Sequence, residues 1–345
     1  MDHKGGLIGG SVFLIVFDDV GAAAGGIHRG GRRKDMKAIR VHERGGPEVL
    51  IYEDAPRPML LPGDALVRVY ASAITKDELT WDPTYQTEAG EPRTPSIPGH
   101  EFSGVVEELA LDTKARKIGQ EVYGLASFYR NGSAAEFIAV RADDLAAKPK
   151  TLDHVQAAAV PLAALTAWQA LFSHAMLTRG QRVLIHGGAG GVGSFAVQMA
   201  NWVEASVITT AAANNHDFVR QLGAHEVINY AKARFEDEVS DVNVVFDTIG
   251  GDTLERSYGV LRQGGTLVSI VEPPSAEKTK ARGINGKFFI VEPNRAQLEE
   301  IGRQIDSGRL RAFVDTVLPL EQARQAFEQG LKGHSRGKIV LRIAG

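Results

Sequence analysis

The 345-residue chain contains no cysteine. Disulfide bridges, thiolate zinc sites and cysteine nucleophiles are therefore excluded, and nothing in the cysteine usage points to secretion. The chain also lacks a dominant charge, because its formal net charge at pH 7 is only -3 and its one locally basic stretch is Arg29–Lys34. This balance argues against a general nucleic-acid binder and against a protein that charge holds on anionic membranes.

The apolar run Leu7–Phe17 near the start of the chain is too short to span a bilayer, and two aspartates follow it directly. A secretory signal peptide would use Lys4 as its positive flank and the alanines from Ala22 onward as its cleavage region, but this charge pattern is poor. We therefore expect residues 1–35 to be a disordered or spuriously translated extension, and the protein to be cytoplasmic.

The composition, 43% hydrophobic and 23% charged residues, is typical of a soluble globular protein. The length suits two domains. From Met36 to about Pro149, short β-rich runs alternate with turn residues, a spacing typical of a partly open β-barrel. The strands expected there are Lys37–Val41, Ala65–Ala71, Gly104–Glu108, Glu121–Leu125 and Ala135–Val140.

A helical stretch follows from Asp153 to Phe172. Asp153 is suited to the N-cap position, and we expect Pro161 to kink or divide the helix because proline removes a backbone donor. Strands and helices then alternate, the pattern of a doubly wound parallel sheet. The expected strands are Arg182–Ile185, Ser206–Thr210, Glu226–Asn229, Asn243–Asp247, Thr266–Ile270, Lys287–Val291 and Lys338–Ile343, with helices near Phe195–Ala200, Asn215–Leu222, Thr253–Leu261, Asn294–Asp306 and Leu320–Leu331.

The most informative stretch is the glycine cluster between the first of these strands and its helix. Gly188, Gly190 and Gly193 fit the spacing G-x-G-x-x-G, in which glycines make a tight turn, admit a pyrophosphate to the backbone and let the helix pack closely. The N–H groups of Gly191, Val192 and Gly193 would hold the pyrophosphate at the positive end of the helix dipole. The sequence thus predicts dinucleotide binding.

The end of the next strand bears on which dinucleotide binds. An NAD-binding domain normally places Asp or Glu there to hold the ribose hydroxyls. This strand instead ends with Thr209, Thr210 and Ala211, and the first acid is Asp217. Because no carboxylate would repel a 2′-phosphate, the sequence favours NADP(H).

Several longer motifs carry a resemblance to a known family. They are PGHEFSGVV from Pro98, AAVPLAALTAWQALF from Ala158, IHGGAGGVG from Ile185, FDTIGGDTL from Phe246 and HSRGKIVL from His334. In these motifs the chain resembles the zinc-free quinone oxidoreductase branch of the medium-chain dehydrogenase/reductase superfamily. The resemblance implies an α/β protein with a GroES-like, partly open β-barrel catalytic domain over residues 36–152. It also implies a doubly wound Rossmann domain over 153–293 and a segment over 294–345 that returns to the catalytic domain.

The same resemblance bears on zinc. Zinc-dependent relatives carry a cysteine shortly before an acidic residue, and a histidine in a GHE motif. Here Thr75 stands at the cysteine position, whereas His100 and Glu101 are retained. One imidazole and one carboxylate are too few for a catalytic zinc, which usually has three protein ligands, so we expect no metal.

The resemblance further implies which residues surround the cofactor. Tyr230 and Arg336 would lie near the 2′-phosphate, with Thr210 and Asn215 near the ribose. Family members often have a lysine at the position of Asn215, so the preference for NADP(H) is weaker here than usual. At the other end, the implied contacts with the nicotinamide and its ribose are Thr166, Thr248, Ile249, Phe289 and Val291. Each of these also fits a purely structural role in a turn or in the core.

Residues for the reaction itself are harder to choose from sequence. Thr75 could approach the nicotinamide or a substrate oxygen, and Trp81 and Tyr85 would give apolar walls suited to a flat conjugated substrate. Asp77 and Tyr85 are the nearest candidates for proton handling. Asp77 equally fits a solvated loop charge.

These observations lead to an NADPH-dependent, zinc-independent reductase that transfers hydride to a quinone or to the β-carbon of an α,β-unsaturated carbonyl. Two alternatives stay open. One is a zinc-independent alcohol or carbonyl reductase, and the other is an NADP(H)-binding redox sensor without turnover. The expected partners are a small conjugated substrate and, by the resemblance alone, a second copy of the chain in a homodimer, with no nucleic acid and no membrane.

Overall fold

The computed structural model describes residues 35–114, 116–333 and 335–344. The expectation of an N-terminal extension over residues 1–35 lies outside these ranges, except for Asp35, the first residue of β1 (Asp35–Val41). Among the described helices, none combines the length and apolar character that crossing a membrane requires.

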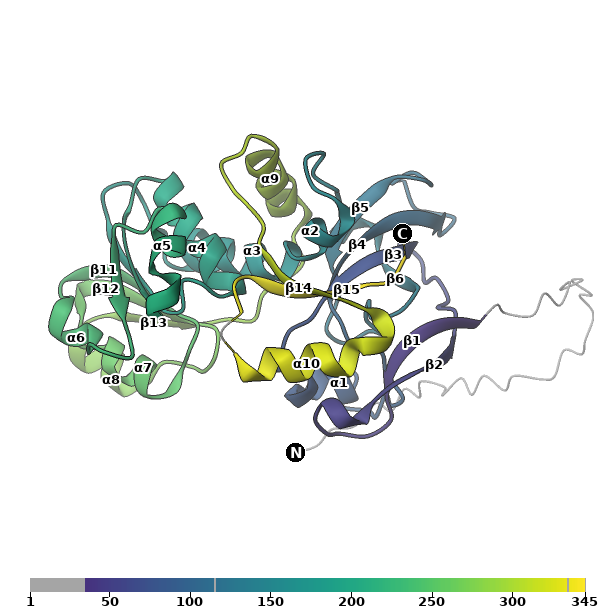
Figure 1. The fold of residues 1–345 in the computed structure, drawn as a ribbon, viewed down its shortest axis with the longest axis horizontal. Helices are drawn as coiled ribbons and strands as arrows, with labels where there is room; N and C mark the ends of the chain where they lie inside the picture. Colours follow the sequence, from purple (N-terminus) through teal and green to yellow (C-terminus); the bar gives the residue numbers. More distant parts are fainter. Residues whose placement is uncertain (1–34, 115, 334, 345) are drawn as a thin grey trace, which may run out of the picture. The chain divides into compact units, whose positions relative to one another are not determined.

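The first sheet contains strands from both ends of the described chain. Its order is β14-β15-β3-β4-β5-β7, and β6 also pairs with β3. The antiparallel pairing of β15 with β3 brings the C-terminal strands beside the N-terminal ones, as Figure 1 shows. Strands β1 and β2 form a separate antiparallel pair. The bounds are β2 Leu50–Pro56, β3 Asp64–Ala73, β4 Glu101–Leu109, β5 Glu121–Leu125, β6 Phe137–Arg141, β7 Ala146–Ala147, β14 Val314–Pro319 and β15 Lys338–Arg342, with α1 at Asp82–Tyr85.

The helical stretch after this sheet is divided as predicted. Asp153 caps α2 (His154–Ala158) by accepting from the Gln156 backbone N–H, while the Gln156 side chain accepts from Asp153. Pro161 begins α3 (Pro161–Trp168), which continues into a π-helical turn over Gln169–His174. A fully buried face of α3 packs on the next helix, α4 (Gly191–Trp202), in the largest apolar core.

The second sheet is parallel throughout and has the order β10-β9-β8-β11-β12-β13. Counted from β8, this is the strand order of a doubly wound dinucleotide-binding fold. Helices lie along it in Figure 1. Its strands are β8 Arg182–Ile185, β9 Ser206–Ala211, β10 Glu226–Asn229, β11 Val242–Asp247, β12 Leu261–Ser269 and β13 Asn285–Phe288, and the remaining helices are α5 His216–Gln221, α6 Phe235–Glu238, α7 Gly251–Ser257, α8 Ala276–Arg282, α9 Arg295–Asp306 and α10 Ala323–Lys332.

The structure corrects several predicted elements. The strand expected at 287–291 lies at 285–288, so Phe289 and Val291 follow it. The helix expected to reach Leu261 ends at Ser257, and Leu261 instead begins β12, where it pairs with Val242 of β11. The sequence did not indicate β2 or β14, which bury few side chains and therefore lack the alternating apolar pattern of a half-buried strand.

Candidate cofactor and substrate site

The turn from β8 to α4 has the geometry that the glycine spacing predicted. A Cβ atom at Gly193 would lie 2.1 Å from the Gly187 carbonyl oxygen, and one at Gly188 would lie 2.1 Å from Thr209 Oγ1. At Gly190, by contrast, the nearest neighbour would be 3.4 Å away. Gly188 and Gly193 are therefore required for packing, whereas Gly190 keeps the backbone open toward the space in front of the helix.

That space is a cavity of about 650 Å³ that runs along the start of α4. The first N–H groups of a helix have no partner within it and carry its positive dipole end, so they suit a phosphate. The cradle thus fits a dinucleotide. The predicted site residues that line the cavity are Thr75, Asp77, Gly190, Gly191, Val192, Gly193, Thr210, Asn215, Tyr230, Thr248 and Ile249.

The end of β9 carries no carboxylate. Asp217, the first acid after it, has a 92% exposed side chain that pairs with Arg220. Arg336 lies here instead, and its guanidinium donates to Asn215 Oδ1 and to the Asn214 carbonyl oxygen, each at 2.6 Å. Both acceptors are uncharged. The Arg336 guanidinium beside the end of β9 is therefore held by two neutral oxygens, and neither of these two contacts neutralises its charge.

A neutral histidine lies beneath the glycine turn. The His186 ring nitrogens face Thr210 Oγ1 at 3.3 Å and Ser257 Oγ at 3.0 Å. Complete burial is the main cause that lowers the pKa of His186 to about 3. Thr210 Oγ1 also accepts from the Gly187 N–H at 3.2 Å. Although Thr210 lines the cavity as predicted, its hydroxyl is already bonded to the turn.

On the barrel side of the cavity, three side chains from distant segments meet, and we call them the Lys338 cluster. Lys338 Nζ, at the start of β15, lies 2.7 Å from Glu101 Oε1 and 3.3 Å from Thr75 Oγ1. Glu101 Oε2 accepts from the Leu162 N–H at 3.0 Å. The Glu101 and Lys338 side chains are 1% and 11% exposed, so this is a nearly buried ion pair at the cavity wall.

His100 has a separate partner. Its Nε2 lies 3.1 Å from Glu78 Oε1, and both side chains are buried. The ring of Trp81 lies nearly parallel to that of His100, with centroids 6.3 Å apart, and meets Phe128 edge-on. Trp81 is not among the residues that line the cavity. Within residues 35–114, 116–333 and 335–344, no three histidine, aspartate or glutamate side chains gather closely enough to hold a metal ion.

The two predicted proton donors differ in position. Asp77 lines the cavity, with a 55% exposed side chain 3.8 Å from Lys76. Tyr85 does not line it, because this side chain is buried in the barrel and its hydroxyl donates to the Leu79 carbonyl oxygen at 2.8 Å. Burial is the main cause that raises the pKa of Tyr85. The hydroxyl proton of Tyr85 is thus already used within the barrel, which argues against the predicted donor role.

Several other predicted contacts lie outside the lining of the cavity. Thr166 is buried and donates to the Leu162 carbonyl oxygen at 2.6 Å. The Phe289 ring lies tilted against that of His174, with centroids 4.3 Å apart, and Val291 is buried in the core. Gly188 packs against Thr209, and Arg336 is exposed beside the cavity. Their assigned contacts stay predictions.

Sequence reasoning missed Lys338. The signal was present, because Lys338 lies in the motif HSRGKIVL, in which only Arg336 received a role. Sequence reasoning also passed over Leu162 and Ile270, apolar residues that line the cavity.

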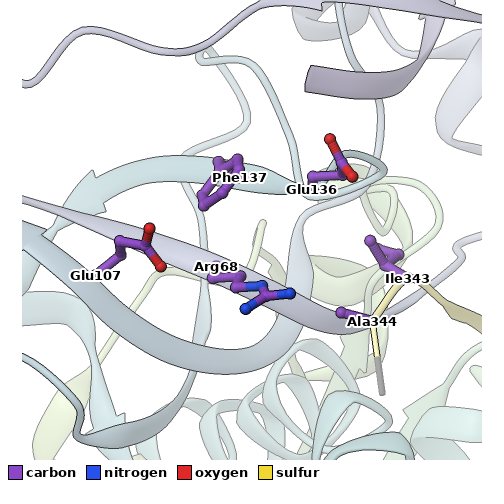
Figure 2. Close-up of a pocket in the computed structure, with 6 residues that line it drawn as sticks. All are labelled: Arg68, Glu107, Glu136, Phe137, Ile343 and Ala344. Atoms are coloured by element: carbon purple, nitrogen blue, oxygen red, sulfur yellow. The ribbon is translucent and has the colours of Figure 1, made fainter. Parts of the chain in front are cut away.

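A second cavity, of about 290 Å³, lies elsewhere on the first sheet and shares no lining residue with the first. Figure 2 shows Arg68, Glu107, Glu136 and Phe137 around it, with Ile343 and Ala344 at one side. It has neither a glycine turn nor a helix start. Nothing in its lining indicates a cofactor.

With this geometry in place, comparison with known proteins identifies the class. Residues 61–150 match the alcohol dehydrogenase GroES-like domain, and residues 222–341 match the zinc-binding dehydrogenase family. The chain belongs to the medium-chain dehydrogenase/reductase superfamily, in its quinone oxidoreductase-like branch. It is an oxidoreductase that uses a nicotinamide cofactor.

Individual relatives match over most of their length. The chain is 34% identical to a probable mitochondrial zinc-binding oxidoreductase of Arthroderma benhamiae, with 84% of this chain and 91% of that protein covered. It is 32% identical to the chloroplastic NADPH-dependent alkenal/one oxidoreductase of Arabidopsis thaliana, with 89% and 80% covered. The solved structure of the quinone oxidoreductase from Coxiella burnetii superposes with a TM-score of 0.84 at 33% identity, covering 90% of this chain and 99% of that one.

Proposed function

We propose that this oxidoreductase is an NADPH-dependent, metal-independent reductase of quinones or α,β-unsaturated carbonyls. The observation that carries the proposal is the cavity itself, because it joins the glycine turn to the Lys338 cluster. The names of the relatives from Arabidopsis thaliana and Coxiella burnetii support the class of acceptor.

The preference for NADPH rests on the end of β9. A 2′-phosphate there would meet the Arg336 guanidinium, which is held by neutral Asn215 and by the Asn214 carbonyl. Tyr230 lines the cavity and is 56% exposed, so its ring is accessible to the adenosine end of a dinucleotide. Charge-assisted hydrogen bonds to phosphate are stronger than neutral ones, which supports discrimination against NADH.

Metal independence rests on the donor set. A catalytic zinc takes three protein ligands and keeps one position open. Here Thr75 offers a neutral hydroxyl, Glu101 is paired with the Lys338 ammonium, and His100 Nε2 faces Glu78. These residues do not fit a zinc ion, although relatives carry zinc in their names.

The residues that are present can position a conjugated acceptor. When bound, reduced nicotinamide supplies a hydride. The apolar side chains of Ile74, Leu162 and Ile270 line the cavity and exclude water from part of it, and Thr75 supplies a hydroxyl at the same wall. Conjugated acceptors spread the negative charge that develops, so they depend less on a Lewis acid than a simple ketone does.

The test begins with fluorescence titration of the protein with NADPH and with NADH. A 1,4-benzoquinone and then a 2-enal are added to the NADPH complex, and cofactor oxidation is followed by absorbance. We expect tighter binding of NADPH, oxidation with at least one acceptor, and a saturated aldehyde as the product from the enal. Treatment with a metal chelator should leave the rate unchanged.

Other outcomes separate the alternatives. An allylic alcohol as product would show carbonyl reduction and overturn the acceptor class. Binding without oxidation of any acceptor would overturn the reductase in favour of a redox sensor. Loss of activity with the chelator, restored by zinc, would overturn metal independence alone.

We also propose that two copies pair along β13. This strand is last in the order of the parallel sheet, all four of its residues are exposed, and Ile290 beyond it is 67% exposed. An edge strand at the end of the sheet order, with the exposed apolar side chains of Phe288 and Ile290 at and beyond its end, is suited to continuing a sheet in a second copy. Light scattering should give twice the chain mass of 37.1 kDa, and a monomer mass would contradict the pairing.

A further inference from the structure

We propose that Lys338 and Thr75 form a proton relay to the substrate oxygen, with Thr75 as the catalytic donor and Lys338 as the group that orients and recharges it. This inference rests on the proposed function, because it concerns the acceptor that occupies the same cavity. It assigns Lys338, which had no predicted role, to orienting the hydroxyl, and it assigns Thr75 to donating the proton.

The direction of the hydrogen bond carries the first step. An ammonium group has three donors and no acceptor, so Lys338 Nζ can only donate to Thr75 Oγ1, 3.3 Å away. The Thr75 hydroxyl must then direct its own proton elsewhere. Because Thr75 lines the cavity, an acceptor oxygen placed there would receive that proton.

The charge of Lys338 is kept in place by the fold. Glu101 Oε1 lies 2.7 Å from Nζ, and its other oxygen is held by the Leu162 N–H. The aliphatic part of Lys338 lies against the first residue of α4, since a Cβ at Gly191 would be 2.7 Å from Lys338 Cδ. The ammonium therefore lies between the cofactor cradle and the barrel wall, where a positive charge stabilises a developing oxyanion.

The reaction balances as follows for an enone. Hydride forms the new C–H bond at the β-carbon, the C=C electron pair shifts toward oxygen, and NADPH is oxidised to NADP⁺. The enolate oxygen takes the proton of Thr75, which is replaced by a proton from the Lys338 ammonium. The resulting amine takes a proton from solvent, and the enol converts to the saturated carbonyl.

The first experiment measures kcat and KM for a set of variants with NADPH and the best acceptor. We expect Thr75→Val and Lys338→Met each to lower kcat about 100-fold, the usual cost of removing one donor to an oxyanion. Thr75→Ser should recover most of kcat. Lys338→Arg keeps the positive charge but should stay as slow as Lys338→Met, because a guanidinium does not give up its proton in a protein and so cannot recharge Thr75. The double variant Thr75→Val/Lys338→Met should be little slower than either single one, because both act in one relay.

A binding experiment tests the two residues without requiring the protein to turn over a substrate. The 4-nitrophenolate ion mimics the enolate oxygen, and its binding to the NADP⁺ complex is followed by absorbance. We expect Thr75→Val and Lys338→Met to weaken its affinity about tenfold, as loss of a charge-assisted hydrogen bond would. The dissociation constant for NADPH, measured by fluorescence without any acceptor, should change little.

A matched control tests the cost of deleting a nearly buried lysine. Lys148 is 7% exposed and pairs with Glu121 at 3.4 Å, and it does not line the cavity. Lys148→Met should leave kcat and nitrophenolate binding as in the wild type. If Lys338→Met fails to fold, Thr75→Val and Lys338→Arg still test the relay.

The results that overturn the relay differ from those that overturn the function. If Lys338→Met or Thr75→Val keeps a wild-type kcat and nitrophenolate affinity, the relay is wrong and the reductase stands. If Lys338→Met raises only the NADPH dissociation constant, Lys338 serves the dinucleotide phosphates and the relay is again wrong. If the wild type fails to oxidise NADPH with every acceptor tested, the proposed function fails. In that case the relay is still tested separately, because unchanged nitrophenolate binding in the variants would overturn it.

Discussion

The glycine turn and the Lys338 cluster line the same cavity, but they are built in different ways. The turn is one continuous segment, in which Gly193 packs against the Gly187 backbone, and the neighbouring strand β9, through Thr209 and Thr210, adds contacts to Gly187 and Gly188. The Lys338 cluster joins side chains from the loop after β3, from β4 and from β15, and Thr75 and Lys338 are 263 residues apart in the sequence. The cofactor cradle thus depends mainly on the steric limits of one short segment and its neighbouring strand, whereas the Lys338 cluster depends on segments far apart in the sequence.

Breaking the ion pair of the cluster should have the largest effect on stability. Glu101→Gln removes the charge opposite the nearly buried Lys338 ammonium, and we expect the free energy of unfolding to fall by about 3–5 kcal/mol. Urea denaturation measures this change. Glu101→Gln/Lys338→Met should recover much of the loss because it removes both charges. A double variant as unstable as the single one would contradict this account of the pair.

Changing the glycine turn tests the other side of the comparison. Gly193→Ala would place a Cβ 2.1 Å from the Gly187 oxygen, a backbone atom that cannot move cheaply, so we expect about 1–3 kcal/mol of destabilisation and loss of NADPH binding. Gly190→Ala is the matched control, because its nearest neighbour lies 3.4 Å away. Its unfolding free energy should stay within about 0.5 kcal/mol of the wild type. Equal destabilisation by both variants would contradict the view that Gly193, but not Gly190, is required because a side chain there would clash.

His186 gives a pH-dependent test of the same comparison. It lies under the glycine turn, but its lowered pKa comes from burial by the rest of the fold. Its folded pKa of about 3 is below the ordinary value of 6.5, so the unfolded chain binds the proton first as the pH falls. Its contribution to stability is therefore present above pH 6.5 and is lost toward pH 3. From pH 7 to 5 this loss is about 2 kcal/mol.

Urea denaturation of the wild type and of His186→Gln at pH 7 and at pH 5 measures this effect. The glutamine amide can still reach Ser257 but does not titrate, so the variant should lose less stability than the wild type. The difference between the two proteins cancels the contribution of the carboxylates that they share. Identical losses would contradict a neutral, buried His186.

The smallest expected effect is at Arg336, which is distant in the sequence but donates to Asn214 and Asn215, just after β9. Arg336→Ala should raise the dissociation constant for NADPH about tenfold, equivalent to about 1.4 kcal/mol, and leave that for NADH nearly unchanged. Fluorescence titration measures both. Arg311→Ala is a control, because its exposed guanidinium donates to the Gln221 carbonyl and does not line the cavity. Equal weakening of both cofactors by Arg336→Ala would remove the argument for a 2′-phosphate contact.

What the sequence determined by itself is the part whose physics is local. The glycine spacing specified the turn and the helix start, Asp153 specified its capping box, and Pro161 specified the break between α2 and α3. Each depends on contacts between residues close in the chain, where steric and hydrogen-bonding rules apply directly. The missing carboxylate after β9 was equally visible, because that position follows from the strand alone.

Only the tertiary structure decided which side chains meet at the cavity. It paired Lys338 with Glu101 and Thr75, placed His100 against Glu78, and turned the Tyr85 hydroxyl into the barrel toward Leu79. It also placed β14, which has no fully buried side chain, and β2, in which only Leu50 and Ala55 are buried, so neither strand has the apolar alternation of a half-buried strand. These outcomes depend on which distant strands pair and on which side chains become partners of buried charges. The pattern of residues close together in the sequence does not determine either.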